Sequence, residues 1–434
     1  MSVRAVLFAG LLVLPVVAHA VPRIRHWTLK NGARVYFVRS RSVPMVDINV
    51  AFDAGSARDP HGRSGLAMLV DSMIGQGAGT LTTGQIDRRL DDVGAALGAS
   101  SGRDMATVSL QTLSQRKMRD PAVRVMALSL EHPTFPVPNF ERKVRDALLG
   151  LKFVHQSLSS VANRRFMSLV YHGHPYAAYP GGTAAGLRAI RRRDLISFYR
   201  RYYVGRNAVV AIVGDVSVNA ARGISSEIAG HLPAGTKPPP LPPVHSLRHA
   251  VFVRLPYPSV QTQILIGAPG IARGAPDYFP LIVGNYILGG DPLESRLAME
   301  LRQKHPLSYT SYSYFYPMRQ RGPFVISVLT RNADRGTALR LARQTLAHFL
   351  ATGPTAAEVV AAKRYLTGSF PLHIDSDAKL AGYLTIIGFY GLPLDYLNRM
   401  IPHIEAVTVR EIDQAFRAHV RPDRMVTLVV GGRK

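Results

Sequence analysis

A proline-rich segment divides this chain of 434 residues into two parts of similar length. Residues 233–243, PAGTKPPPLPP, contain six prolines in eleven positions. Proline fixes its own φ and has no backbone N–H, so this segment is expected to run as an extended polyproline II linker outside any helix or sheet. The linker leaves residues 21–232 as one part and residues 244–434 as the other.

The two parts repeat the same order of secondary-structure signals. An alternating apolar stretch opens each part, at 46–56 and at 261–269, and amphipathic helical patterns follow it. Each part ends in an apolar strand closed by glycine, at 207–217 and at 424–432. This order predicts an α+β fold of two tandem homologous repeats, each a mainly antiparallel sheet with helices packed on one face.

The first twenty residues have the organisation of a secretory signal. Arg4 supplies the positive start, residues 5–18 are uncharged and mostly apolar, and residues 18–20 form a small-x-small cleavage site. An uncleaved membrane anchor is the alternative, but the apolar stretch contains Pro15 and is short for a membrane span. No later stretch is long enough for a span, and the chain has no cysteine. We therefore predict a signal peptide at 1–20 and a periplasmic protein.

The chain carries a formal net charge of +25. Its basic residues are scattered, apart from a short run at 191–193, and no nucleic-acid-binding motif accompanies them. We therefore predict no nucleic-acid partner. The charge fits a solvated basic surface, or attraction to acidic peptides or to an acidic partner protein.

A short amphipathic helix is predicted around residues 65–73, GLAMLVDSM. Met68, Asp71 and Ser72 stand at i, i+3 and i+4, so they share one face of this helix. That is the spacing of a zinc-binding His-x-x-Glu-His helix, in which two imidazoles one turn apart bind the metal. None of the three residues is a good zinc ligand or general base in this setting.

Several sequence motifs follow one another along the two parts. The first part contains LKNGARVYFV, GSARDPHGRSGLA, YHGHPYAAYPGGT and NAVVAIVGDV. The second part contains PDYFPLIVGNYILGGDPLESRLAMELRQKHPLSYTSYSYF, AAKRYLTGSFPL and GFYGLPLDYLNRMIPHIEAVT. With these motifs in this order, the chain resembles the pitrilysin family of peptidases, the inverzincins, in particular its processing-peptidase branch with two repeats per chain. The resemblance implies that one chain forms half of a clamshell around an unfolded peptide.

The resemblance also identifies the positions that would hold zinc in an active member. Met68 and Ser72 occupy the two histidine positions, and Asp71 occupies the position of the glutamate that serves as general base. The third ligand of the family is a glutamate in a following long helix, at a register that falls on Leu149 or Gly150. A catalytic zinc needs three protein ligands. The joint loss of all three predicts that this chain holds no metal.

The second part retains a pair of residues that the resemblance makes functional. In the family, an arginine that ends a helix and a tyrosine seven residues later donate hydrogen bonds to the substrate carbonyl as it becomes an oxyanion. Arg302 and Tyr309 have this spacing. The structural alternative is a solvated cation at a helix end and an ordinary strand tyrosine. Pro306 stands where the family usually has glycine, which can shift the turn that presents Tyr309.

Some members of this family are heterodimers in which one subunit lacks the zinc ligands and retains the arginine and the tyrosine. This chain shows the same pattern. We therefore predict a chain that is inactive alone, has no cofactor of its own and joins a zinc-bearing His-x-x-Glu-His homologue to cleave unfolded peptides. An inert structural or peptide-holding homologue is the alternative. An independent hydrolase is disfavoured, because the chain has no cysteine and no recognised serine-nucleophile elbow. His172 and His174 lack a third ligand close in sequence, so a structural turn is preferred there over a metal site.

Overall fold

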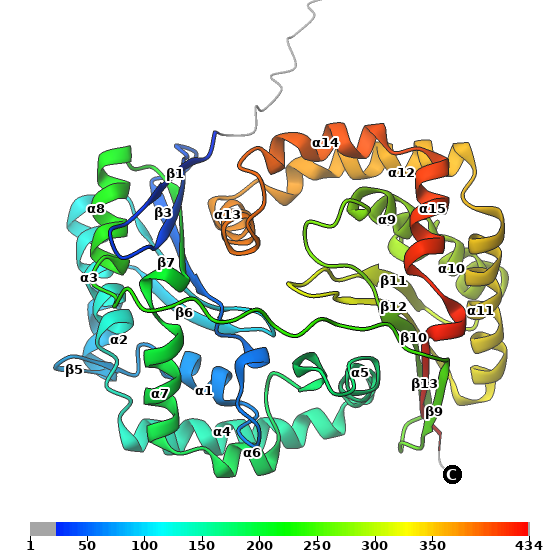
Figure 1. Cartoon of the computed structure of the whole chain (residues 1–434), viewed down its shortest axis with the longest axis horizontal. Helices are drawn as coiled ribbons and strands as arrows, with labels where there is room; N and C mark the ends of the chain where they lie inside the picture. The colour runs from blue at the N-terminus through cyan, green and yellow to red at the C-terminus, as the bar shows by residue number, and fades with distance from the viewer. Residues whose placement is uncertain (1–22, 433–434) are drawn as a thin grey trace, which may run out of the picture.

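The computed structural model describes residues 23–432, and the predicted signal peptide at 1–20 lies outside the described residues. It contains two large sheets, one in each part of the chain, with helices around and between them (Figure 1). The proline-rich linker crosses from one part to the other as an extended segment. None of the described helices combines the length and the apolar composition needed to cross a membrane.

The first sheet has six strands in the order β1-β2-β8-β3-β7-β6, with β2 and β8 parallel and the other neighbours antiparallel. These strands are β1 (Arg25–Thr28), β2 (Arg34–Arg39), β3 (Met45–Phe52), β6 (Ala96–Ser101), β7 (Ala106–Leu113) and β8 (Ala208–Gly214). Every residue of β8, AVVAIVG, is buried, as expected for a central strand covered on both faces. At the edge, β6 pairs with β7 alone and its small residues are partly exposed.

Most helices of the first part cover one face of this sheet. The helices are α1 (Leu66–Met73), α2 (Thr83–Asp91), α3 (Arg116–Glu131), α4 (Val137–Gln156), α5 (Leu158–Val170), α6 (Ala184–Ala189), α7 (Arg192–Tyr202) and α8 (Val218–Ala229), and a small hairpin of β4 (Gly77–Ala78) and β5 (Leu81–Thr82) follows α1. Phe37 and Ile48 of the sheet lie in one apolar core with Leu69 of α1, Leu195 of α7 and Ile224 of α8. The apolar stripe of each amphipathic helix therefore faces the sheet.

The second sheet has five strands in the order β11-β12-β10-β13-β9, and only β13 and β9 are parallel among its described pairs. The strands are β9 (Val251–Leu255), β10 (Gln261–Pro269), β11 (Thr310–Phe315), β12 (Pro323–Arg331) and β13 (Val426–Gly431). The helices are α9 (Tyr278–Asn285), α10 (Arg296–Ala298), α11 (Arg335–Thr352), α12 (Ala356–Ser369), α13 (Asp377–Tyr390), α14 (Tyr396–Ala406) and α15 (Val409–His419). Ile266 and Phe324 of this sheet share a core with Phe349 of α11 and Phe416 of α15.

Each sheet is covered on its other face by a helix from the other part of the chain. Helix α13 of the second part lies on β8, β3 and β2 of the first sheet (Figure 1). Its Leu380 and Leu384 share an apolar cluster with Tyr36 and Val209. Gly388 permits this close approach, because a Cβ there would lie 2.5 Å from Tyr36 and Val209. The helix and the sheet therefore meet with almost no space between them.

Helix α5 of the first part makes the reciprocal contact with β10 and β13 of the second sheet. Ala162 and Phe166 of α5 pack in one cluster with Leu265 and Leu428. The predicted fold class is confirmed. The expectation of helices on one face of each sheet was incomplete, because central strands that are apolar on both sides need cover on both faces.

Side chains from both parts hold the carbonyl groups of the linker. Arg58 Nη1 donates a hydrogen bond to the Pro239 oxygen at 2.8 Å, and His174 Nε2 bonds to the Pro242 oxygen at 2.9 Å. From the second part, Gln320 Nε2 donates to another linker carbonyl at 3.2 Å. Since proline has no N–H, these carbonyl groups are the polar groups through which the segment can be fixed.

Candidate functional site

Helix α1 carries the degenerate zinc motif and begins at a tightly built turn. Gly65 precedes the helix with a φ of 101°, a conformation that favours glycine. Asp59 accepts hydrogen bonds from the backbone N–H groups of Gly65 and Ala67, both at 2.7 Å. Burial raises the pKa of Asp59 to about 7, against the opposing effect of these two hydrogen bonds. Asp59 therefore holds the start of the helix through two backbone hydrogen bonds.

The motif positions on α1 do not present donors to a common point. Met68 is partly buried and packs against the first core, and Ser72 Oγ donates back to the Leu69 oxygen at 2.9 Å. Asp71 is only 2% exposed and lies beside the buried hydroxyl of Tyr203. Burial raises the pKa of Asp71 to about 8, so this carboxyl is largely protonated at neutral pH. A protonated acid inside the core cannot serve as a base for solvent water.

We expect the buried Asp71 carboxyl to make stability fall as pH rises. Its pKa of about 8 in the folded chain lies above the ordinary aspartate value of 3.8, so between these pH values unfolding releases a proton. The free energy of unfolding then decreases by up to about 1.4 kcal/mol per pH unit from this group. Asp71→Asn removes this titrating group. The free energy of unfolding of the variant, measured by urea unfolding, should therefore increase relative to that of the wild type from pH 5 to pH 8.

The control for this measurement is Ser72→Ala on the same helix, whose difference from wild type should not depend on pH. Asp59 titrates in the same range but is present in every variant, so it cancels in the comparison. A difference between Asp71→Asn and wild type that stays constant over this pH range would show that the carboxyl is ionised in the folded chain.

The position of the third zinc ligand lies on α4. Leu149 is 51% exposed, and a Cβ at the neighbouring Gly150 would meet nothing within 4 Å. Neither residue offers a metal donor. Within residues 23–432 no group of three or more histidine, aspartate or glutamate side chains is arranged to hold a metal ion.

His174 has a structural role in the turn after α5. Its Nδ1 accepts a hydrogen bond from the backbone N–H of Tyr176 at 3.0 Å, so Nε2 carries the proton that is donated to Pro242. Burial lowers the pKa of His174, which keeps the ring neutral. With both ring nitrogens engaged, His174 is not free to join His172 around a metal.

The sequence also contains one match to the Gly-x-Ser-x-Gly pattern, GASSG at 98–102, contrary to the expectation that no such elbow is present. It lies on the edge strand β6 and on the turn into β7. A serine-hydrolase elbow requires a sharp turn from a strand into a helix, with the serine at its apex. The match is therefore part of a hairpin and not a nucleophile elbow.

Arg302 and Tyr309 are both exposed in the second part of the chain. Arg302 lies in a π-helical turn, Met299–Lys304, and its Nη1 makes one long hydrogen bond, 3.5 Å, to the Pro292 oxygen. Tyr309 directly precedes β11 and is 91% exposed. No hydrogen bond joins the two side chains. Their donors are therefore free for a group outside the described chain, but the described residues do not fix them in place.

β6 is an edge strand that contacts α1. β6 contacts α1 on one side and pairs with β7 on the other, so its outer N–H and C=O groups remain unpaired by the sheet. Such an edge can accept an extended peptide as an added strand. Its sequence, ALGASS, has small side chains that leave room for a partner strand.

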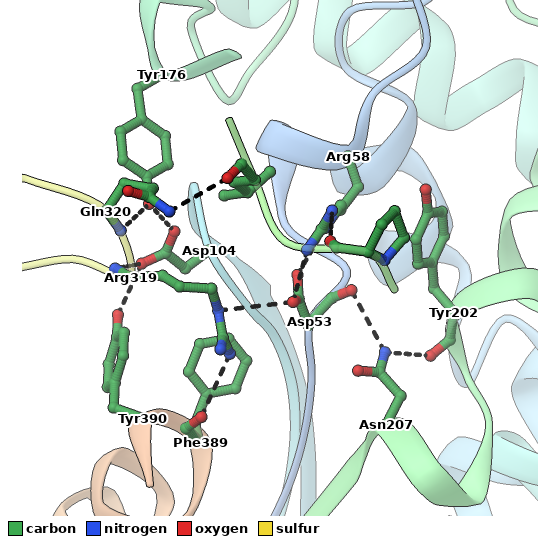
Figure 2. A network of polar contacts seen from close by, with 12 residues as sticks. Asp53, Arg58, Asp104, Tyr176, Tyr202, Asn207, Arg319, Gln320, Phe389 and Tyr390 are labelled. Atoms are coloured by element: carbon green, nitrogen blue, oxygen red, sulfur yellow. Dashed lines mark hydrogen bonds and ion pairs between the residues drawn. The ribbon is translucent and has the colours of Figure 1, made fainter. Parts of the chain in front are cut away.

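A network of polar contacts near the end of β6 joins the first part of the chain to the second (Figure 2). Asp104, in the turn between β6 and β7, is 5% exposed and accepts three hydrogen bonds. Tyr176 donates its hydroxyl to Asp104 Oδ1 at 2.5 Å, while Tyr390 and the backbone N–H of Arg319 donate to Oδ2 at 2.9 and 2.7 Å. Tyr390 ends α13 and Arg319 follows β11, so one carboxylate of the first part holds two segments of the second.

A second carboxylate completes the same network. Asp53, at the end of β3, forms a two-pronged ion pair with Arg58, with both N···O distances 2.8 Å. Arg319 approaches Asp53 at 3.6 Å, and its guanidinium lies 4.2 Å from the ring centre of Phe389 (Figure 2). Asn207 donates to the backbone oxygen of Asp53 at 3.3 Å. Sequence reasoning missed this network, since its members are far apart in the chain.

Comparison with known proteins agrees with this architecture. Residues 34–180 match the family described as Insulinase (Peptidase family M16), and residues 189–366 match the Peptidase M16 inactive domain. A crystal structure of a peptidase M16 inactive domain from Pseudomonas fluorescens is 34% identical, covers 95% of this chain and 99% of its own, and superimposes with a TM-score of 0.91. The chain belongs to peptidase family M16.

Two curated relatives show the range of this family. The non-peptidase homolog YmxG of Helicobacter pylori is 21% identical over 92% of this chain and 92% of its own length. The human mitochondrial-processing peptidase subunit beta is 23% identical over 90% of this chain and 82% of its own length. The predicted resemblance to pitrilysin-type peptidases is thus confirmed. The matched proteins include one named as an inactive domain, one named as a non-peptidase homolog and one named as a peptidase subunit.

Proposed function

We propose that this M16 chain is the zinc-lacking subunit of a two-chain peptidase. In this proposal it holds an extended peptide and supplies Arg302 and Tyr309 to the oxyanion formed on a partner that carries the His-x-x-Glu-His helix and its zinc. The predicted signal peptide at 1–20 would place the complex in the periplasm. A likeness to a protein named as a subunit supports the need for a partner.

One observation carries this proposal. The candidate acid in the first part is buried, whereas the two candidate hydrogen-bond donors in the second part are exposed. In the first part, the zinc-motif helix has its acid buried and protonated at Asp71. In the second part, Arg302 and Tyr309 project with almost no internal partners. Two free hydrogen-bond donors seven residues apart in sequence suit a developing negative charge supplied from outside the chain.

The alternative is a peptide-holding homologue that takes no part in catalysis. It is favoured by the lack of any contact that fixes Arg302 relative to Tyr309, because transition-state donors are effective when they are preorganised. Both functions require an extended peptide at a sheet edge, and the free edge of β6 supports that shared requirement.

Co-expression with an exported M16 homologue that has an intact His-x-x-Glu-His motif tests the proposal. We expect a one-to-one complex in size-exclusion chromatography, zinc in the partner alone by elemental analysis, and cleavage of unfolded peptides by the complex only. The matched control is each chain purified by itself. Separate elution of the two chains would favour the peptide-holding alternative, and one tightly bound zinc per copy of this chain alone would contradict the proposal.

A further inference from the structure

A cavity of about 450 Å³ lies at the junction of the two parts of the chain. One wall comes from α5 and the loop after it, including Arg164 and Tyr179. The opposite wall comes from β11 and the residues that follow it. Arg103, in the turn between β6 and β7, lines the cavity as well. The site therefore exists only when the two parts are docked together.

Three tyrosines form a ladder along the β11 wall. Tyr312, Tyr314 and Tyr316 occupy alternate positions, so their side chains leave the same face of the chain, whereas Ser311 and Ser313 are buried on the other face. The rings of Tyr312 and Tyr314 are stacked with centroids 6.0 Å apart. Burial raises the pKa of Tyr314 to about 12, so its hydroxyl remains a hydrogen-bond donor at neutral pH.

The two arginines of the cavity have no acidic partner. Arg103 Nε donates to the Tyr176 oxygen at 3.1 Å, which leaves its two terminal nitrogens without a hydrogen bond in the described structure. Arg164 contacts His155 at 2.9 Å and lies 5.7 Å from the ring centre of Tyr179. Neither arginine takes part in an ion pair among residues 23–432.

No acidic side chain lines the cavity. The nearest carboxylate in sequence, Asp104, is already engaged by Tyr176, Tyr390 and Arg319. Burial lowers the pKa of Arg103, although a guanidinium keeps its charge throughout the physiological range. The cavity is thus aromatic, positively charged and without an internal counterion.

Arg103 links the cavity to the end of β6. Arg103 follows the last strand residue, Ser101, by only two positions. A peptide added to the β6 edge advances about 3.3 Å per residue, so one that continues past Ser101 approaches the turn that carries Arg103. Repulsion by the two arginines disfavours an amino terminus or a basic side chain at this point.

We propose that this cavity is a subsite that binds a carboxylate of an extended peptide held by the chain. The carboxylate comes from an aspartate or glutamate side chain or from the peptide's C-terminus, since the two have the same chemistry. Arg103 and Arg164 pair with it, because guanidinium and carboxylate groups form strong charge-assisted hydrogen bonds. The tyrosine ladder packs against the adjoining part of the peptide. This subsite rests on the peptide-holding role included in the proposed function.

Fluorescence anisotropy with labelled unstructured peptides tests the subsite. Three peptides differ at two places only: a glutamate in the middle with an amidated C-terminus, glutamine there with a free C-terminus, and glutamine there with an amidated C-terminus. We expect the first or the second to bind at least about tenfold more tightly than the third, as a charge-assisted contact implies. Which one gains affinity identifies the source of the carboxylate.

Arg103→Gln and Arg164→Gln should each remove most of this gain in affinity. Neither substitution should change the affinity for the third peptide, which has no carboxylate at either place. Arg165→Gln is the matched control, because it removes the same charge from an exposed neighbour on α5 that does not line the cavity. If Arg103→Gln fails to fold, the more peripheral Arg164→Gln still decides the result. An equal effect of Arg165→Gln would show a general charge effect and overturn the subsite.

The outcomes separate this inference from the function on which it rests. Equal affinity for all three peptides overturns the carboxylate subsite and leaves the peptide-holding role intact. Absence of binding to any of the peptides at submillimolar concentration contradicts the peptide-holding role, and the subsite falls with it. Failure to form the two-chain complex, with the carboxylate preference retained, removes only the catalytic part of the proposed function.

Discussion

In a complex with its zinc-bearing partner, Tyr309→Phe is expected to lower kcat by about 10²–10³-fold, the effect of removing one oxyanion donor. Peptide affinity should change little, because the hydroxyl acts on the charge that develops in the transition state. The side chain is 91% exposed, so its loss removes no packing from this chain. Steady-state and single-turnover cleavage of one unfolded peptide by the purified complex give both quantities.

Arg302→Lys should impair the same step, since a lysine keeps the charge but loses the planar set of donors. Tyr365→Phe serves as the control, because this tyrosine is also exposed, at 55%, and lies on α12 outside the proposed site. Zinc content and complex formation should be the same in all three variants. Wild-type cleavage by a complex that carries both Tyr309→Phe and Arg302→Lys would leave this chain only a structural role.

The second large effect is expected on stability, from Asp104→Ala. The substitution leaves the hydroxyls of Tyr176 and Tyr390 and the N–H of Arg319 without their acceptor. Each unsatisfied buried group costs about 1–3 kcal/mol, so the loss of the acceptor for three groups should lower the free energy of unfolding by about 3–9 kcal/mol. Urea unfolding, followed by far-ultraviolet circular dichroism and by tyrosine fluorescence, measures the loss.

Tyr390→Phe removes only part of the same network, so we expect it to lower the free energy of unfolding less than Asp104→Ala does. It removes one donor and leaves Asp104 with two, so it should cost only about 1 kcal/mol. Asp120→Ala provides the control, because Asp120 pairs with its neighbour Arg119 on α3 and contacts nothing in the second part. A loss for Asp104→Ala no larger than that for Asp120→Ala would mean that the network does not hold the two parts together.

Much of the fold followed from the sequence, because its signals are local. Six prolines in 233–243 and strands rich in valine and isoleucine mark the linker and the two sheets without any tertiary information. The exchanged helices did not follow, although α13 carries a clue. Its sequence, DAKLAGYLTIIGFY, is apolar around most of its circumference, which indicates a helix buried on several sides. The pattern cannot say which sheet covers it.

The candidate site was only partly predictable for the same reason. The resemblance predicted that Met68 and Ser72 occupy two zinc-ligand positions, since those two ligands of an active member share one helix. Burial of Asp71 against Tyr203 depends on a residue more than a hundred positions away. Asp104 and its tyrosine partners are likewise joined by tertiary packing alone. The spacing of residues in the sequence identifies functional groups that share one helix or strand. It does not identify contacts between residues on different helices, strands and loops.

The exchange of α5 and α13 has a consequence for how this chain reaches its native state. The first sheet cannot cover its second face until residue 390 has been synthesised, because α13 ends there. A chain that emerges amino terminus first therefore exposes the apolar second face of this sheet until most of the chain has been synthesised. Contacts between residues so distant in sequence also form slowly. We expect its biogenesis to depend on a chaperone that shields this surface until the last helices arrive.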